Sequence, residues 1–436
     1  MGSRVAAVVT ALVGVIMMAM AVAACGSGGS SPVLSPTPSP PASRTAAPVY
    51  ADAPTPAKPT RASAERYGKS PLTDPLWGFG LDLLARQAAK TGDNVVVSPV
   101  SLSAVLSMTL NGARGETAAQ MRKALRLESI HPQAVSQSWA DLITSSNATQ
   151  RAQVRISDSL WLRDGVAYVP SFMAANRDYF AADTRNLPSD LAKAPDEINS
   201  WVAQRTGGRI KDLVVTLSPE TALVLVNTVY AKVGWDLFDK AQTKPEPFTL
   251  ADGTDVQVPT MHGLTTAEVA TTAEYDAVPV QTNGELTFWV VVPKGSQTPE
   301  SVAALLRDRG AGALARETTH AAVAIALPRF RIEYESRDLN ADLSAMGMPD
   351  AFSRDTADFS GMADVHPLYI DSVLQKAMID VNEKGVEAAA GSAVLMAGAA
   401  PPTKRLTVRA DRPFLVVLAG SYTAAPLFMA LVRDPR

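Results

Sequence analysis

Apolar residues recur along most of the chain in short runs and at helical spacing, and together they predict one long α+β fold. Asn94 to Val97 forms a short apolar strand, and Ser98 followed by Pro99 predicts a helix start, because proline at the first helical position loses no backbone bond. Further strands are predicted over residues 221–230, 278–280, 286–292, 321–329, 368–370, 378–381, 406–408, 414–418 and 427–432. Strands outnumber helices in the carboxyl-terminal half without regular strand–helix alternation, which argues against a parallel α/β fold.

Three of these elements carry more specific information. The helix after Ser98 is predicted to run to Leu110, with a second helix starting near Thr117. The strand over residues 221–230 is interrupted only by Asn227; its composition suits burial on both faces, where a lone amide must find hydrogen-bond partners. The Asn-Gly pair at residues 283–284 predicts a tight hairpin between its two flanking strands.

The first 24 residues have a different pattern. A single early charge, Arg4, precedes an uncharged apolar run from Val5 to Val22, the composition of a signal peptide or a membrane helix. Small residues then lead directly into Cys25, and this junction resembles the lipobox of bacterial lipoproteins. The resemblance implies that residues 1–24 are removed and that the Cys25 thiol carries a diacylglyceryl anchor. A signal peptide with an incidental cysteine and a transmembrane helix are the alternatives, the latter opposed by the lack of a following basic cluster.

Residues 25–71 are rich in Pro, Ser, Thr and Ala and contain almost no large apolar side chains. Such a segment cannot bury enough surface to offset its conformational entropy, so we predict an extended tether with a polyproline II bias. A lipid on Cys25 would then anchor the chain to the outer side of a cell membrane, the tether would hold the domain over residues 72–436 away from that membrane, and without the lipid the protein would be secreted. The proline-rich stretch as a ligand for a proline-binding module is the less favoured interpretation.

Composition and charge exclude several classes of function. The chain has 40 Lys and Arg against 43 Asp and Glu, and this net charge of -3 argues against a nucleic-acid partner. Cys25 is the only cysteine, which rules out an internal disulfide, and the four histidines lack metal-ligand spacing, so we expect no metal and no cofactor. The sequence lacks a GxSxG elbow, an HExxH motif and a Walker A loop, so an enzyme is not expected and a lipoprotein hydrolase is the weakest hypothesis.

The stretch between the strands at 378–381 and 406–408 is long, small and nearly uncharged. Loops of this length in a compact domain are usually functional or disordered, and an Ala/Gly-rich linker is the simpler interpretation. If the stretch became a strand, one face would carry only uncharged side chains, namely Val386, Ala388, Ala390, Ser392 and Val394. Glu387 would fall on the other face, so the segment could enter a sheet without burying a charge.

Several motifs, in order along residues 72–436, resemble the serpin family. They are NVVVSPVS at 94–101, GARGET at 112–117, INSWV at 198–202, TGGRI at 206–210, LVNTVYAK at 225–232, LPRF at 327–330, AFS at 351–353, ADFSG at 357–361, EKGVEAAA at 383–390 and DRPF at 411–414. Each motif alone is weak, but the ordered set is specific, and the chain is identified as a member of that family.

The resemblance implies a fold of three β-sheets and about nine helices, with an exposed reactive-centre loop over roughly residues 383–405. It also implies a monomer that inhibits serine proteases irreversibly as a suicide substrate. The protease attacks the loop and forms an acyl-enzyme, and the cleaved loop inserts into the central sheet before water can release the enzyme. A non-inhibitory serpin that acts as a binding module is the alternative function.

The resemblance further assigns a hinge at the start of the loop. The hinge residues are Glu383, Gly385, Val386, Glu387, Ala388, Ala389, Ala390, Gly391 and Ser392. Val386 stands where the family usually has Thr or Ser, and because it is uncharged and of similar volume, inhibition is still expected.

The family's usual spacing, counted from Glu383, places the scissile bond at Ala399–Ala400. A small apolar residue on the acyl side suits elastase-like or subtilisin-like proteases, which have shallow specificity pockets. Because the loop after this bond is longer than in many serpins, cleavage beside Met396, or beside the basic Lys404 or Arg405, stays open as an alternative with a different target class.

Residues elsewhere in the chain match the family's supporting cluster. Ser98, Ser101 and Asn227 correspond to the hydrogen-bonded group beneath the opening sheet, and Trp235 corresponds to the point where insertion starts. Gln375 stands where the family commonly has histidine, and glutamine can also donate and accept hydrogen bonds there.

Overall fold

The computed structural model describes residues 70–436 except for 149–152, 220, 233, 284–285, 316–317, 337, 386–403 and 422. The predicted signal peptide, Cys25 and all but the last two residues of the predicted tether lie outside the described residues. In the described part, no helix has the length and apolar content needed to cross a bilayer.

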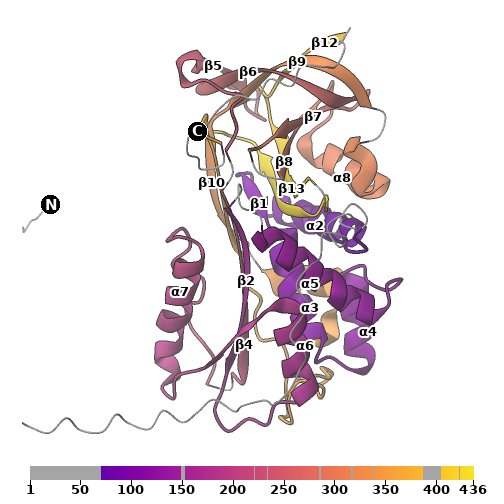
Figure 1. Ribbon diagram of the computed structural model, residues 1–436, viewed down its shortest axis with the longest axis vertical. Helices are drawn as coiled ribbons and strands as arrows, with labels where there is room; N and C mark the ends of the chain where they lie inside the picture. Colours follow the sequence, from indigo (N-terminus) through magenta and orange to yellow (C-terminus); the bar gives the residue numbers. More distant parts are fainter. Residues whose placement is uncertain are drawn as a thin grey trace, which may run out of the picture. The chain divides into compact units, whose positions relative to one another are not determined.

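The described chain contains eight α-helices and three β-sheets, which confirms the α+β class (Figure 1). The helices are α2 (Thr73–Ala88), α3 (Pro99–Leu110), α4 (Gly115–Ala124), α5 (Pro132–Ala148), α6 (Pro170–Phe180), α7 (Ala194–Arg205), α8 (Pro299–Arg309) and α9 (Leu339–Ala345). Short 3-10 helices span Leu191–Lys193, Lys240–Gln242, Ala311–Ala315 and Pro349–Phe352.

The largest sheet has nine strands in the order β1-β14-β13-β8-β7-β6-β9-β12, with β5 paired to β6. Its strands are β1 (Val95–Val97), β14 (Pro426–Val432), β13 (Phe414–Gly420), β8 (Leu286–Pro293), β7 (Tyr275–Gln281), β6 (Asp255–Thr271), β9 (Thr318–Pro328), β12 (Lys404–Arg409) and β5 (Lys244–Thr249). Only β12 and β9 run parallel; the other neighbours are antiparallel.

Two smaller sheets share the rest of the strands. One has the order β3-β2-β4, with β3 (Asp183–Asn186), β2 (Gln153–Leu162) and β4 (Leu223–Lys232). The other pairs β10 (Phe330–Glu335) with β11 (Lys376–Val381). In Figure 1, α7 covers one face of β2 and β4, while α3, α5 and α6 lie on the other face.

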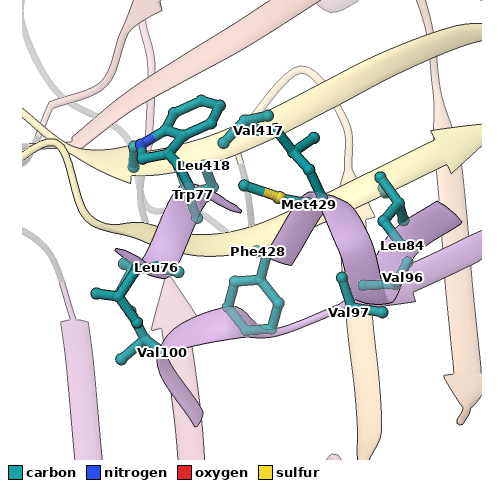
Figure 2. Packing of buried hydrophobic residues seen from close by; sticks show 14 of the residues in the cluster. Leu76, Trp77, Leu84, Val96, Val97, Val100, Val417, Leu418, Phe428 and Met429 are labelled. Atoms are coloured by element: carbon teal, nitrogen blue, oxygen red, sulfur yellow. The ribbon is translucent and has the colours of Figure 1, made fainter. Parts of the chain in front are cut away.

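The main hydrophobic core forms where α2 crosses the end of the nine-stranded sheet. Figure 2 shows Leu76, Trp77 and Leu84 of α2 packed with side chains of β1, β13 and β14. Every residue of β14 is buried, and in β13 only the terminal Gly420 is partly exposed. These strands are therefore covered on both faces, which accounts for their uninterrupted apolar sequences.

The start of α3 confirms the prediction from Ser98 and Pro99. The Ser98 side chain accepts a hydrogen bond from the backbone N–H of Ser101, and Pro99 occupies the first turn. This cap satisfies one of the helix N–H groups that have no partner within the helix. It also holds Ser98 at the junction of β1 and α3.

Two strand predictions need correction. Residues 368–370 are not a strand: Leu368 and Ile370 pack against the main core, but the Ile370 N–H bonds to the Ala351 carbonyl beside a 3-10 helix. The strand containing Asn227 was predicted to be buried on both faces, yet Leu223, Val224 and Leu225 are only half-buried. Both segments border a cavity, which explains why their apolar content overstates their burial.

Candidate functional site

The two smaller sheets each end in a strand with one unpaired edge. Among the described residues, β4 pairs only with β2, and β11 pairs only with β10. Free backbone N–H and C=O groups along such edges are a template for an added strand. We call the space bounded by β4 and β11 the slot.

A cavity of about 200 Å³ lies at the end of the slot where both strands begin. Its lining combines the first half of β4, the segment 367–375 that leads into β11, residues 213, 214 and 216–218, and one face of α3. Ser101, Asn227 and Gln375 from the predicted cluster are all on this lining. The structure therefore places these three residues, which lie far apart in the chain, around one space.

The other end of the slot is bridged by Trp235, three residues after β4. Its indole N–H donates to the carbonyl of Asn382, the residue after β11, at 3.0 Å. The Trp235 ring is 3% exposed and packs edge-on against Phe238 and Phe288. Because β4 and β11 both run from the cavity towards this bridge, they point in the same direction.

The chain reverses immediately after the bridge. Asn382 and Gly385 exchange two backbone hydrogen bonds, of 3.1 and 2.9 Å, and the N–H of Lys384 bonds to the Asn382 side chain at 3.0 Å. Gly385 has φ = 107°, a conformation that residues with a Cβ rarely adopt. A strand continuing from Gly385 back through the slot would be antiparallel to both β4 and β11.

Glu383 fixes this turn from the side. Its carboxylate accepts hydrogen bonds from the Thr243 hydroxyl and from the Arg329 guanidinium, whose Nε lies 2.5 Å away. Burial alone would raise the pKa of Glu383, but the bonds from Thr243 and Arg329 outweigh it and hold the pKa below its ordinary value. Glu383 is thus ionised at neutral pH and ties the turn to the start of β10.

Gln375 and Ser98 meet beside the cavity. The Gln375 amide donates to the Ser98 carbonyl at 2.9 Å and accepts from the Ser98 N–H at 3.2 Å, while the Ser98 hydroxyl donates to the Leu427 carbonyl at 2.7 Å. One neutral side chain therefore satisfies both backbone groups of Ser98. Glutamine suits this site because it has a donor and an acceptor on one planar group.

Asn227 lines the same cavity but bonds elsewhere. Its amide donates to Asp158 of β2 at 2.7 Å, and the two residues are direct partners in the β2–β4 register. Sequence reasoning missed Asp158. Strand alternation carried a usable indication, because Asp158 falls on the same face as the buried Ile156 and Leu160.

The remaining predicted residues lie outside the described residues. They are the hinge residues Val386, Glu387, Ala388, Ala389, Ala390, Gly391 and Ser392, the bond Ala399–Ala400, and Cys25. Their assignments stay predictions. Within the described ranges, no group of three or more His, Cys, Asp or Glu side chains is placed to hold a metal ion.

Comparison with known proteins gives consistent matches over most of the chain. The family model described as "Serpin (serine protease inhibitor)" matches residues 76–435. An uncharacterized serpin-like protein of Thermococcus kodakarensis is 31% identical over 381 residues, covering 84% of this chain and 87% of that protein. The leukocyte elastase inhibitor of Bos taurus is 30% identical over 374 residues, covering 82% and 97%. The crystal structure of human thyroxine-binding globulin has a TM-score of 0.74 at 26% identity, covering 86% and 99%.

Proposed function

The chain belongs to the serpin family, and from this premise we propose that it is an irreversible suicide-substrate inhibitor of serine proteases. The observation that carries the proposal is the slot, with two free strand edges pointing in the same direction and a chain reversal at Gly385. A cleaved loop that entered the slot would pair with β4 and β11 at once. Each backbone hydrogen bond gained there contributes about 1 kcal/mol net, which supplies a driving force for insertion.

Insertion must be faster than hydrolysis of the acyl-enzyme, so the side chains that face the protein interior must be small and uncharged. The residues of matching parity, Val386, Ala388, Ala390 and Ser392, meet this requirement. Val386 is the one departure from the family's usual Thr or Ser. As an uncharged, β-branched residue it enters a sheet readily.

A matched pair of charge insertions tests this mechanism. The protein is incubated with an elastase-type and a subtilisin-type protease, and complexes that survive SDS are counted by electrophoresis. We expect Ala390→Arg to be cleaved without trapping the protease, because an inward arginine blocks insertion, whereas Ala389→Arg should still trap it. Cleavage of the unaltered protein without any covalent complex would refute the inhibitory function.

For the target class, we propose elastase-like or subtilisin-like proteases with cleavage at Ala399–Ala400. Support comes from the small acyl-side residue and from the similarity to a protein named as an inhibitor of leukocyte elastase. Mass spectrometry of the released carboxyl-terminal fragment identifies the bond directly. A fragment beginning after Met396, Lys404 or Arg405 would instead indicate a protease with a larger apolar pocket or a trypsin-like one.

A non-inhibitory serpin that acts as a binding module is the second candidate. The fold similarity to thyroxine-binding globulin, whose name describes the binding of thyroxine, favours it. The two functions differ in the consequence of loop cleavage. An inhibitor gains a strand and its melting temperature rises sharply on cleavage, whereas a chain that does not insert its loop keeps the same melting temperature.

We further propose that the protein is a monomer anchored outside the cytoplasm by a lipid on Cys25. The apolar run before Cys25 and the proline-rich segment after it support this placement. Partition of the full chain into detergent phase should be lost in Cys25→Ser. Equal partition of the two proteins would contradict the anchor without affecting the inhibitory mechanism.

A further inference from the structure

Asp158 and Asn227 form a buried pair behind the slot. They face each other across β2 and β4, and the Asn227 Nδ2 donates to Asp158 Oδ1 at 2.7 Å. Asp158 is 3% exposed. A carboxyl group is rarely buried in a strand without a cation, so this one needs a physical explanation.

The oxygen atoms that take no part in this hydrogen bond indicate the protonation state of Asp158. Asp158 Oδ2 and Asn227 Oδ1 are both buried, and neither has a hydrogen-bond partner among the described residues. If Asp158 were ionised, both atoms would be acceptors and neither could satisfy the other. A proton on Asp158 makes Oδ2 a donor, and a carboxylic acid and a primary amide can then form two reciprocal hydrogen bonds.

Among the described side chains of the elements packed on this face, no counter-charge offsets an ionised Asp158. The face that it shares with Asn227 is covered by α3, which contains no charged residue, and by α5, where the only charged residue, Asp141, bonds to Gln137. On α6, Arg177 and Asp178 pair with each other at 2.8 Å.

The charged residues of β3 belong to the opposite face of the sheet. Asp183 and Arg185 of β3 pair with Ser159 and Trp161, which face α7. Accordingly, burial raises the pKa of Asp158 to about 7, and the bond from Asn227 opposes only part of the shift.

We propose that Asp158 is protonated in the native protein, donates to Asn227 Oδ1, and with it forms a pH-sensitive latch that holds β4 against β2 at the edge of the slot. On ionisation the two orphan oxygens become mutually repelling acceptors, and the latch opens. Asn227 lines the cavity, so its amide is a group that an inserting strand would meet. The effect on loop insertion rests on the proposed function, but the protonation state and its effect on stability do not.

The sign of the pH dependence follows from the raised pKa. An unfolded chain ionises Asp158 in the ordinary acidic range, whereas the native protein keeps the proton until about pH 7. The stabilisation is therefore complete at low pH and is lost as the pH rises through about 7. The native protein should be easier to unfold on the alkaline side.

Infrared spectroscopy of the full chain in D2O tests the proton directly. We expect a carbonyl band of a neutral carboxylic acid at pH 6 that fades by pH 9, and that is missing in Asp158→Asn at both values. Asp141→Asn, which removes the carboxyl group that Gln137 bonds on α5, should retain the band. Absence of the band from the unaltered protein at pH 6 would overturn the proposal, whether or not the protein inhibits a protease.

Urea unfolding between pH 5 and pH 9 supplies the second readout. Asparagine at position 158 keeps a donor and an acceptor on one planar group and cannot ionise, so Asp158→Asn should have a higher midpoint than the unaltered protein at pH 8 and a flatter pH profile. Asp141→Asn should follow the unaltered profile. If the unfolding midpoints of Asp158→Asn and the unaltered protein change in parallel with pH, the latch does not exist.

The rate of complex formation with a protease tests the link to insertion. A covalent complex that forms faster at pH 9 than at pH 6 in the unaltered protein, but not in Asp158→Asn, would connect the latch to insertion. A rate with the same pH dependence in both proteins would refute that connection alone.

Discussion

The two sheets that bound the slot are held in the molecule in different ways. The three-stranded sheet β3-β2-β4 shares a separate hydrophobic cluster with α7, whose buried members are Trp161, Leu187, Ala194, Ile198, Trp201, Val202, Ile210, Val214 and Val226. Two arginines extend this packing, because Arg185 lies over the Trp161 ring and Arg205 over the Trp201 ring, each at 5.5 Å. This sheet and α7 therefore form a layer with its own core.

The two-stranded sheet β10-β11 has no such separate cluster among the described residues. Its buried side chains, such as Ile332 and Ile379, belong to the main core. Tyr334 of β10 donates to Gln87 of α2 at 2.9 Å, and Gln87 donates to Asp342 of α9 at 2.6 Å. The other face of β2 and β4 also contributes to the main core through Ile156, Leu160 and Val229. From the contrast we expect that, when the slot widens, the layer with α7 moves as a unit while β10-β11 stays fixed in the core.

The largest difference between the two sheets is expected when a large side chain is removed from the centre of the layer that α7 forms with β2, β3 and β4. Trp201→Ala deletes a large side chain that is 3% exposed, at a cost of about 3–5 kcal/mol. Because its cluster is separate, hydrogen exchange measured by mass spectrometry should rise in β2, β3 and β4 more than in β10 and β11. Trp139→Ala in the main core should raise exchange in both sheets. An equal rise in both sheets for Trp201→Ala would show that the layer is not an independent unit.

Removing the hydrogen bond that anchors β10-β11 to α2 should raise hydrogen exchange in β10-β11 and leave the other sheet little changed. Tyr334→Phe removes the hydroxyl that bonds to Gln87, and loss of a buried hydrogen bond costs about 1–3 kcal/mol. Exchange should increase in β10 and β11 while β2 and β4 are little changed. A rise confined to β2 and β4 would contradict the assignment of the fixed side.

The sequence predicted local features of these two regions better than it predicted which distant residues contact one another. The strands predicted over residues 221–230 and 378–381 and the Ser98 cap depend on neighbouring residues, and local pattern identified them. The strands β2, β3 and β10 and the turn at Asn382–Gly385 were not predicted. Asn227 and Asp158 are 69 positions apart, and Arg329 and Glu383 are 54 apart, so their pairing depends on strand register and tertiary packing. Residues 368–370 show the opposite error, since an apolar run can pack on a core without pairing as a strand.

Gln375 supplies a second anchor for β10-β11 and a way to test it with the residue common in the family. Gln375→His can retain only one of the two bonds to Ser98 in a given tautomer, so we expect a loss of about 1 kcal/mol at neutral pH. A buried histidine is easier to keep neutral than charged, so its pKa would fall, and stability would be lost as the pH drops through that lowered value. Thermal unfolding of the two proteins between pH 5 and pH 8 measures this. Indistinguishable profiles would mean that the two bonds do not hold β11.

The smallest effect is expected at Glu383, which ties the hinge turn to the start of β10. Its pKa is lowered mainly because hydrogen bonds from Thr243 and Arg329 outweigh burial, so its stabilisation is present above the ordinary pKa of a glutamate and is lost as the pH falls through the lowered value. Arg329 is partly exposed, and we therefore expect Glu383→Gln to cost only about 0.5 kcal/mol at pH 7, with the difference from the unaltered protein shrinking towards pH 4. Glu333→Gln is the matched control, because the Arg331–Glu333 pair lies on β10 with both side chains about half exposed, and its removal should change the urea midpoint very little. If the two variants lose the same stability, the ion pair at the turn is an ordinary surface contact, and β10-β11 is held by its core packing and the Tyr334 and Gln375 anchors alone.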